Sequence, residues 1–461
     1  MNPTRVAFVI ACAILPLIAS AQTPRPDSYL ANNRPPDDRF KADILVVVAH
    51  PDDEGMAAAY IARAIDQGKR VAIVWTTRGD GGQNEVGPEQ GPAMGDIREF
   101  EGMQAAASLG VKLMWNLGGP DTPTQNPLNS LATCDHARCL ARIVRLVRLT
   151  RPDAILTWLP APVTGENHGD HQAAGIMATE AFDMAGDPTV FPEQVMPAAE
   201  PGENANHLAG LRPWQPQKLY YFANSKENEF LDGRGPTYDA TDVSPTRHMA
   251  YGEMAARAFA IQETQGGRAV RDQLDRRAQG VVQGPLPFIK PTQFLMGKSL
   301  VTSAVTDDVL AGTDPAGIPF QPSPGYHSMP VTDPTLLVGG VWDYYREFWR
   351  AHGLGIFAGL VPIELTVAAG DRLSLPLIVE NPTAASINVT FTVDSDSHFF
   401  VAAIAPLTVL PHSRAFTRMH AQAPPIFVTG WQQFKVTALS NGKAIGSIPL
   451  RVEMGDWALP Q

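Results

Sequence analysis

Residues 44–54 read ILVVVAHPDDE, and this stretch indicates the fold class. Its first five residues are all branched and apolar, which is typical of a strand buried on both faces of a parallel sheet. The strand runs directly into His50 and three acidic residues. Residues 54–67 then carry Ala, Met and Ile at helical spacing and end near Gly68. The stretch therefore predicts the first strand, loop and helix of an α/β domain.

The same alternation continues along the chain. We expect further strands at 71–75, 111–117, 154–159 and 218–222, and further helices at 96–109, 137–149 and 171–184. Alternating strands and helices form βαβ units, so the sequence predicts a Rossmann-like, mostly parallel sheet with helices on both faces. In such sheets, ligands bind outside the carboxyl ends of the strands, where the winding direction reverses. The residues after the first and fourth strands should therefore line a site.

The chain of 461 residues is longer than one hydrophobic core usually organises, so we expect more than one domain. The α/β domain, with a helical and loop extension that includes a helix at 249–265, is expected over residues 41–354. Residues 355–461 contain short alternating stretches separated by turn signals, such as 363–367, 387–393 and 434–438. This pattern predicts a C-terminal antiparallel β-sandwich.

The first 21 residues have the composition of a secretory signal. Arg5 is followed by an apolar run over 6–18 and by the small residues Ala19-Ser20-Ala21. That run is shorter than the roughly 20 apolar residues of a spanning helix, so we expect cleavage rather than anchoring. Residues 22–40 are polar and Pro-rich, as in an extended leader. The sequence thus predicts a secreted or periplasmic protein with no transmembrane segment after cleavage.

In an oxidising compartment the two cysteines of the mature chain, Cys134 and Cys139, could form one disulfide.

The composition is otherwise that of a folded protein, with 44% hydrophobic and 18% charged residues. The net charge is -11 and no basic run is present, so nucleic acid is excluded as a partner. The first strand lacks a Gly-x-Gly-x-x-Gly fingerprint, and no Gly-x-Ser-x-Gly elbow occurs. These absences argue against a nicotinamide cofactor and a serine hydrolase.

Two polar clusters lie where the sheet predicts a site: His50 to Asp53 after the first strand, and His168 to His171 after the fourth. Catalytic zinc uses three protein ligands and keeps one position open for water. His50 and Asp53 are three residues apart across a turn, and His171 can complete a set of two histidines and one carboxylate. A histidine beside two carboxylates at the end of a buried strand is costly unless a cation compensates. We therefore expect Zn²⁺ at this site, with another divalent metal possible.

The remaining polar residues of the two clusters suggest catalytic roles. Asp52 could act as general base on a water, and a protonated His168 could stabilise an oxyanion and pass a proton to a leaving amine. Asp170 could orient one of the histidines. The alternative is structural, because Pro and acidic residues commonly start helices and Asp170 could cap one.

The motif Ala-His-Pro-Asp-Asp-Glu after the first strand, with a later His-x-Asp-His, resembles the PIG-L/LmbE-like de-N-acetylases. The resemblance covers residues 41–222 and includes a glycine loop at 77–81 and an Arg-x-x-Glu helix at 98–101. It implies that the zinc ligands are His50, Asp53 and His171, that Asp52 is the base and that His168 assists at the oxyanion.

The resemblance also makes Arg98 a candidate contact to an anionic or polyhydroxylated substrate, although Arg98 with Glu101 is equally a plain helix pair.

The expected function is removal of an N-acyl group, in the first place N-acetyl, from an amino sugar or glycoconjugate. An amidase for another amide and a carbohydrate-binding protein with a vestigial metal site are the alternatives. The aromatic residues at 342–349 either stack on sugar or pack one helix face.

Overall fold

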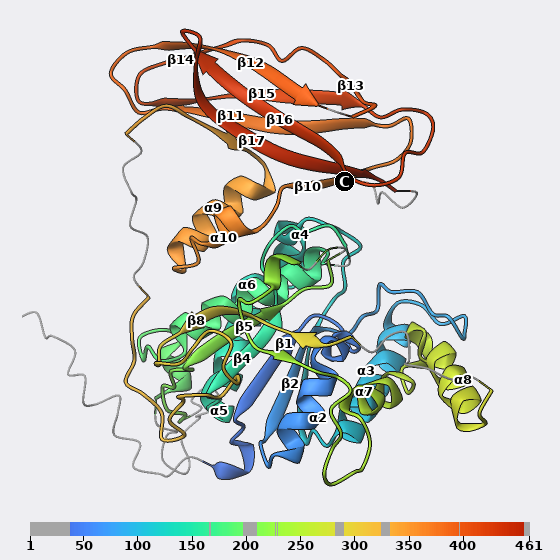
Figure 1. Ribbon diagram of the computed structural model, residues 1–461. Helices are drawn as coiled ribbons and strands as arrows, with labels where there is room; N and C mark the ends of the chain where they lie inside the picture. Colours follow the sequence, from blue (N-terminus) through green and yellow to red (C-terminus); the bar gives the residue numbers. More distant parts are fainter. Residues whose placement is uncertain are drawn as a thin grey trace, which may run out of the picture.

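The computed structural model describes residues 37–165, 167–196, 210–225, 227, 229–281, 290–323, 332–395 and 397–455. Figure 1 shows an α/β layer with a β-sandwich above it, connected by a pair of helices. The predicted signal segment and residues 22–36 of the leader lie outside the described residues. Within the described part of the chain, helices are too short or too polar to cross a membrane.

The α/β layer contains a six-stranded sheet in the order β3-β2-β1-β4-β5-β8. The first five of these strands pair in parallel, and β8 is antiparallel to β5, which confirms the predicted mostly parallel sheet. The strands are β1 (Ile44–Val48), β2 (Val71–Thr77), β3 (Leu113–Gly119), β4 (Ala154–Trp158), β5 (Lys218–Phe222) and β8 (Leu295–Ser299).

The winding direction of this sheet reverses beside β1. The chain passes from β1 outward through β2 to β3, and then returns to place β4 on the other side of β1. Ile44 is paired with Val71 on one side and with Ala154 on the other. Every residue of β1, β2, β4 and β5 is buried, which explains their continuous apolar runs. The loops after β1 and β4 therefore meet at the reversal point, where a ligand site is expected.

Helices cover both faces of the sheet. Alternate residues of β1 enter two separate cores, with Leu45 and Val47 in one and Ile44, Val46 and Val48 in the other. The first core is closed by α4 (Pro127–Thr133), α5 (His136–Thr150) and α6 (Gly169–Met184), and the second by α2 (Ala58–Asp66), α3 (Pro92–Leu109) and α7 (Tyr251–Phe259). Short elements complete the layer: η1 (Asp38–Phe40), η3 (Pro192–Gln194), η4 (Glu229–Leu231), β6 (Thr237–Tyr238), α8 (Gly267–Ala278) and β7 (Thr292–Gln293).

Two predicted helices differ from the structure in where the regular α-helix begins or ends. The helix expected over 54–67 starts as a 3-10 turn, η2 (Asp53–Ala57), because the Asp53 carboxylate bonds the preceding backbone and tightens the turn. The helix expected over 249–265 is α7 followed by a separate 3-10 turn, η5 (Glu263–Gln265).

The sandwich has a five-stranded sheet, β10-β17-β16-β12-β14, facing a four-stranded sheet, β13-β15-β11-β9. Its pairs are antiparallel, as predicted, except that β10 runs parallel to β17. Residues 335–338, which precede the expected boundary at 355, add β9 to the smaller sheet. The strands are β9 (Thr335–Val338), β10 (Glu364–Val367), β11 (Arg372–Asn381), β12 (Ile387–Ser395), β13 (Phe400–Val401), β14 (Leu407–Val409), β15 (Ser413–Gln422), β16 (Gln432–Ser440) and β17 (Lys443–Met454).

Two helices, α9 (Val341–Ala351) and α10 (Phe357–Leu360), lie between the sandwich and the α/β layer (Figure 1). The aromatic residues of α9 are largely packed, with Tyr345, Phe348 and Trp349 buried in the same core as α6. The Tyr345 hydroxyl donates to Gln172 Oε1 at 2.8 Å, and Trp349 Nε1 donates to the carbonyl of Pro160 at 2.9 Å. These side chains therefore pack one helix face.

The two cysteines are free and buried in the structure. Cys134 ends α4, and Cys139 lies in the first turn of α5. The Cys139 thiol donates to the carbonyl oxygen of Cys134 at 2.8 Å. The disulfide that the sequence allows is thus replaced by a thiol–carbonyl hydrogen bond.

Candidate functional site

The loop after β1 is organised by the Asp53 carboxylate. Its Oδ2 atom accepts the backbone N–H groups of Ala49 and His50, both at 2.9 Å, and the indole N–H of Trp158 at 2.8 Å. Three donors on one oxygen fix the orientation of the carboxylate. The other oxygen, Oδ1, is left facing the histidines.

Three side-chain atoms converge at this point. His50 Nδ1 lies 3.1 Å from His171 Nε2, His171 Nε2 lies 3.0 Å from Asp53 Oδ1, and Asp53 Oδ1 lies 3.4 Å from His50 Nδ1. Ligands about 2.1 Å from a tetrahedral zinc ion are separated by roughly 3.4 Å, so the triangle has the dimensions of a metal site. All three side chains are buried. The structure thus brings together the three residues that the sequence proposed as ligands.

Trp158, the last residue of β4, contacts ligands from both loops. Besides donating to Asp53, its ring stacks on that of His171, with centroids 3.9 Å apart and planes inclined by 5°. The indole is buried and cannot rotate away from either partner. It therefore fixes the separation of the two ligand-bearing loops.

The charges around His50 indicate a site that attracts a cation. Burial alone would lower the pKa of His50, but the attraction of Asp53 and hydrogen bonds with Asp121, Asp170 and Asp53 raise it well above its ordinary value. For Asp53, burial works toward a higher pKa, and the neighbouring His171 and His50 bring it well below its ordinary value. Buried carboxylates of this kind are stable only beside positive charge, which a bound divalent cation would supply.

Asp121 was missed by the sequence analysis. It follows β3, and its Oδ1 lies 3.1 Å from His50 Nε2, nearer than Asp170 Oδ2 at 3.6 Å. The rule that sites lie at the carboxyl ends of strands, applied to the third strand as well, would have found it. Asp170 lies in the first turn of α6, where the backbone N–H of Thr122 donates to it at 2.8 Å.

His168 lies against the other two histidines, with its ring 4.0 Å from His171 and 5.0 Å from His50 between centroids. Burial, followed by repulsion from His171 and His50, lowers the pKa of His168 to about 2. The roles that the sequence suggests for His168 need a protonated ring, whereas this shift of the pKa favours the neutral imidazole. A neutral imidazole still offers one N–H donor.

Arg98 and Glu101 do not form the helix pair that their spacing allows. The Arg98 guanidinium is buried, where Nη2 pairs with Asp52 Oδ1 at 2.9 Å and Nη1 donates to the carbonyl of Gly79 at 2.9 Å. Glu101 instead accepts the backbone N–H of Thr264 at 3.2 Å. Arg98 thus holds Asp52 rather than pointing freely into solvent, which is a role the sequence did not reveal.

Glu54, the last residue of the motif, points away from the ligands. It accepts the indole N–H of Trp75 at 3.0 Å and the amide N–H of Gln262 at 2.6 Å. Burial, ahead of the other influences, raises the pKa of Glu54 to about 8. Glu54 therefore joins the β1 loop to the helical extension.

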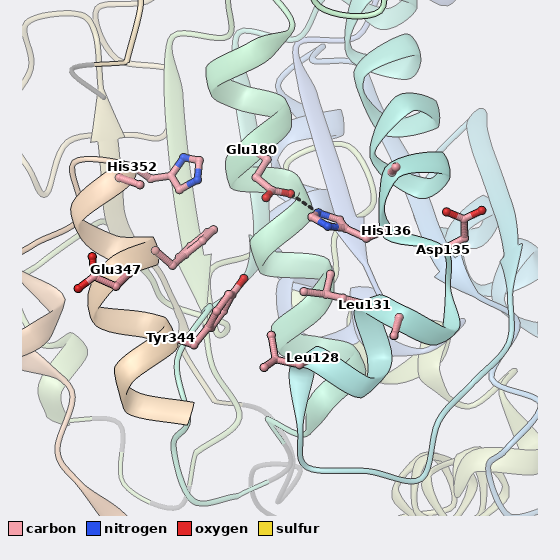
Figure 2. Close-up of a pocket in the computed structure, with 12 residues that line it drawn as sticks. Leu128, Leu131, Asp135, His136, Glu180, Tyr344, Glu347 and His352 are labelled. Atoms are coloured by element: carbon pink, nitrogen blue, oxygen red, sulfur yellow. Dashed lines mark hydrogen bonds and ion pairs between the residues drawn. The ribbon is translucent and has the colours of Figure 1, made fainter. Parts of the chain in front are cut away.

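Two cavities can be compared with this cluster. A cavity of about 520 Å³ is lined by the loop residues 80–84 and 90–91, and its Gly81 N–H donates to Asp121 at 3.2 Å, so it adjoins the site. A cavity of about 840 Å³ lies between α4, α5, α6 and α9, where Figure 2 shows Tyr344 facing the pair of His136 and Glu180. None of the predicted site residues lines this second cavity. The predicted site residues therefore gather at the cluster and not at the larger of these two cavities.

Fold and cluster together define an α/β protein with a candidate metal centre at the carboxyl edge of its sheet. Residues 45–182 match the family model described as PIG-L, GlcNAc-PI de-N-acetylase. The match agrees with the resemblance that the sequence motifs predicted, and the matched residues include every residue of the cluster.

The chain is similar to curated deacetylases over part of its length. It is 30% identical over 166 residues to 1D-myo-inositol 2-acetamido-2-deoxy-alpha-D-glucopyranoside deacetylase of Streptomyces avermitilis, an alignment that covers 32% of this chain and 56% of the relative. A second deacetylase of that name, from Frankia casuarinae, is 32% identical over 169 residues, with 32% and 52% covered. The chain thus spans little more than half the length of these relatives.

Among solved structures, the chain resembles N,N'-diacetylchitobiose deacetylase from Pyrococcus horikoshii. The identity is 19%, the TM-score is 0.38, and the match covers 55% of this chain and 84% of that one.

Proposed function

We propose that the protein is an exported hydrolase that removes an N-acetyl group from an amino sugar or glycoconjugate, with a divalent cation, zinc in the first place, held by His50, Asp53 and His171. The observation that carries the proposal is the triangle of ligand atoms, 3.0 to 3.4 Å apart, two residues of which flank Asp52. Support comes from the PIG-L domain and from relatives whose names describe acetamido-sugar deacetylases.

When bound, such an ion supplies Lewis-acid activation of water and of the acyl carbonyl. We propose Asp52 as the base that accepts the proton of the attacking water, because Arg98 Nη2 holds its carboxylate at 2.9 Å and the side chain is partly exposed. Neutral His168 can donate one N–H hydrogen bond to the carbonyl oxygen as negative charge develops on it. When the carbon–nitrogen bond breaks, the proton held by Asp52 passes to the leaving nitrogen, which gives acetate and a free amine.

Export is proposed from the N-terminal sequence. Arg5, the apolar run and Ala19-Ser20-Ala21 have the order of a cleavable secretory signal. Expression of the full chain in a Gram-negative host followed by N-terminal sequencing of the periplasmic product tests this proposal. A mature chain that begins near Gln22 supports it, and an uncleaved chain in the cytoplasm contradicts it.

The enzymatic proposal is tested by assaying released acetate and free amine on N-acetylglucosamine, its oligomers and N-acyl amino acid amides. Wild-type protein loaded with zinc should act on the sugars. Asp52→Asn should bind the metal with little change and lose about 10²-fold or more in kcat, because the base is lost and the ligands are kept. Absence of turnover by metal-loaded wild type on all sugars would contradict the function, and a fully active Asp52→Asn variant would remove Asp52 from the mechanism.

A further inference from the structure

The loop between β4 and α6 carries His168 and leads into His171, and it is held from inside by amide side chains. Asn167 Nδ2 donates to the carbonyls of Leu159 and Ala161 at 3.0 and 2.8 Å. Gln172 Nε2 in turn donates to the carbonyl of Asn167 at 2.7 Å. These bonds fix the two ends of the loop and leave its middle to be held by something else.

The middle of the loop is held by the sandwich. The backbone N–H of Thr164 donates at 2.9 Å to Oε2 of Glu364, the first residue of β10, which lies 200 positions away in the sequence. The Glu364 side chain is only 3% exposed. A buried carboxylate is costly unless it is paired, so its presence at this point needs a structural reason.

Glu364 is paired on its other oxygen. Arg451 on β17 donates from Nε to Glu364 Oε1 at 3.0 Å, and its Nη1 lies 2.7 Å from Glu227 Oε2. The Arg451 guanidinium also stacks on Trp431, whose indole N–H donates to Glu227. The sandwich thus contacts both the Thr164 segment, through Glu364, and the segment after β5, through Arg451.

These two segments of the α/β layer are also bridged to each other. Gly165, next to Thr164, forms an isolated antiparallel bridge with Ser225, two residues before Glu227. The contacts therefore form a closed series. Glu364 accepts from Thr164, and Arg451 pairs with both Glu364 and Glu227. The segment that carries Glu227 is joined back to Gly165 through the bridge at Ser225. His168 lies only four residues from Thr164 along this loop.

We infer that the sandwich is a working part of the site, and that Glu364 is a positioning residue that holds the His168 loop in its productive geometry through the backbone N–H of Thr164. The inference rests on the proposed de-N-acetylase function, because it assigns Glu364 a role in that reaction. Glu364 itself touches none of the ligands, so its effect is transmitted by the loop backbone. Placement errors of about 1 Å in a catalytic loop can cost roughly 10²-fold in rate.

The test uses two substitutions of Glu364 in the full-length, metal-loaded protein. Glu364→Ala removes the acceptor for Thr164 N–H and the partner of Arg451. Glu364→Gln also removes the ion pair but keeps an oxygen that can accept from Thr164. We expect kcat for N-acetyl sugar hydrolysis to fall about tenfold or more in Glu364→Ala, with KM changed much less, and to recover most of that loss in Glu364→Gln.

Amide hydrogen exchange over residues 159–165 gives a readout that needs no turnover. Exchange of this peptide should be faster in Glu364→Ala than in wild type, and close to wild type in Glu364→Gln. The matched control is Glu380→Ala, which breaks a glutamate–arginine pair between two strands of the sandwich, with Arg414 as partner, away from the loop. It should change neither kcat nor exchange at 159–165.

Unchanged kcat in folded Glu364→Ala would overturn the inference, whatever its stability. Equal losses in Glu364→Ala and Glu364→Gln would also overturn it, because the ion pair rather than the Thr164 contact would then be responsible. Failure of the proposed function has a different signature, since wild type itself would release no acetate from any sugar while its exchange pattern stayed intact.

Discussion

Arg98 and Asp52 form an ion pair, with Nη2 and Oδ1 2.9 Å apart, that joins α3 to the β1 loop. The two residues are not neighbours in the sequence, and the spacing of α3 suggested Glu101 as the partner. The pair leaves Asp52 beside the candidate ligands His50 and Asp53 with its carboxylate held in one orientation. The fixed orientation is what a general base needs, so Arg98 is expected to matter for rate more than for substrate affinity.

Replacing Arg98 by Met tests this expectation. The variant keeps the apolar stem but frees the Asp52 carboxylate, so we expect kcat to fall about tenfold to a hundredfold, with the metal content unchanged. Steady-state kinetics and metal analysis measure both. The control is Arg78→Met, which removes a neighbouring pair with Asp96 and Glu99 that does not reach Asp52. A raised KM with normal kcat would show instead that Arg98 binds substrate.

Gly79→Ala probes the space behind that ion pair. Gly79 has φ of +67°, and an added Cβ would lie 2.5 Å from Arg98 Cζ. The left-handed conformation alone costs about 1–2 kcal/mol for a non-glycine residue, and displacement of Arg98 adds to it. Gly233→Ala is the matched control, because Gly233 has φ of +69° and open space around it. Denaturant unfolding should show a larger loss in Gly79→Ala, and only this variant should lose kcat; equal losses would contradict the packing argument.

Removal of the metal should destabilise the α/β layer. Three buried ligands lose the cation that compensates their charges, and ligand binding to the folded state contributes RT ln(1 + [L]/Kd), about 4 kcal/mol at a thousandfold excess over Kd. A chelator should therefore lower the thermal unfolding midpoint of wild type. In His171→Ala, which lacks one ligand, the midpoint should start lower and respond little to chelator. If chelation leaves the wild-type midpoint unchanged, the triangle is not a metal site.

Asp153 gives a prediction about pH. This carboxylate lies before β4, far from the ligands, and burial, ahead of the attraction of Lys41, raises its pKa to about 6 from an ordinary value near 3.8. The folded state therefore binds the proton more tightly than the unfolded state. The stabilising effect of that proton is complete below pH 4 and is lost as the pH rises through about 6.

Asp153→Asn should remove this dependence. Urea unfolding between pH 4 and pH 7 should show that wild type loses stability relative to the variant as the pH rises, with most of the change below pH 6.5. Parallel curves for the two proteins would mean that Asp153 is charged throughout and that its burial is compensated.

The sequence predicted the sheet well because its strands are buried on both faces, and a continuous apolar run as short as 44–48 is typical of such a strand. The rule that ligands bind at the carboxyl ends of parallel strands located His50, Asp53 and His171, which follow the two central strands, β1 and β4. It did not find Asp121, because that residue follows a strand whose side chains are only partly buried and whose motif contains no histidine.

Partnerships between distant segments could not be predicted from spacing. Arg98 bonds Asp52 because the glycine loop at 79–82 leaves room for a guanidinium, and a helix periodicity contains no information about that loop. The contact of Glu364 with Thr164 joins segments 200 positions apart, and neither residue belongs to a motif. The parallel pairing of β10 with β17 was missed for a similar reason, since alternation predicts a strand but not its direction.

Trp158 has a consequence for how such a protein can diversify. One indole stacks on His171 and donates a hydrogen bond to Asp53, so a single rigid side chain holds together two residues that are more than a hundred positions apart in the sequence. The surrounding loops can then change length and composition while the three candidate ligands keep their spacing. A change of substrate would then require changes in these loops only, and the arrangement of the candidate ligands would be conserved.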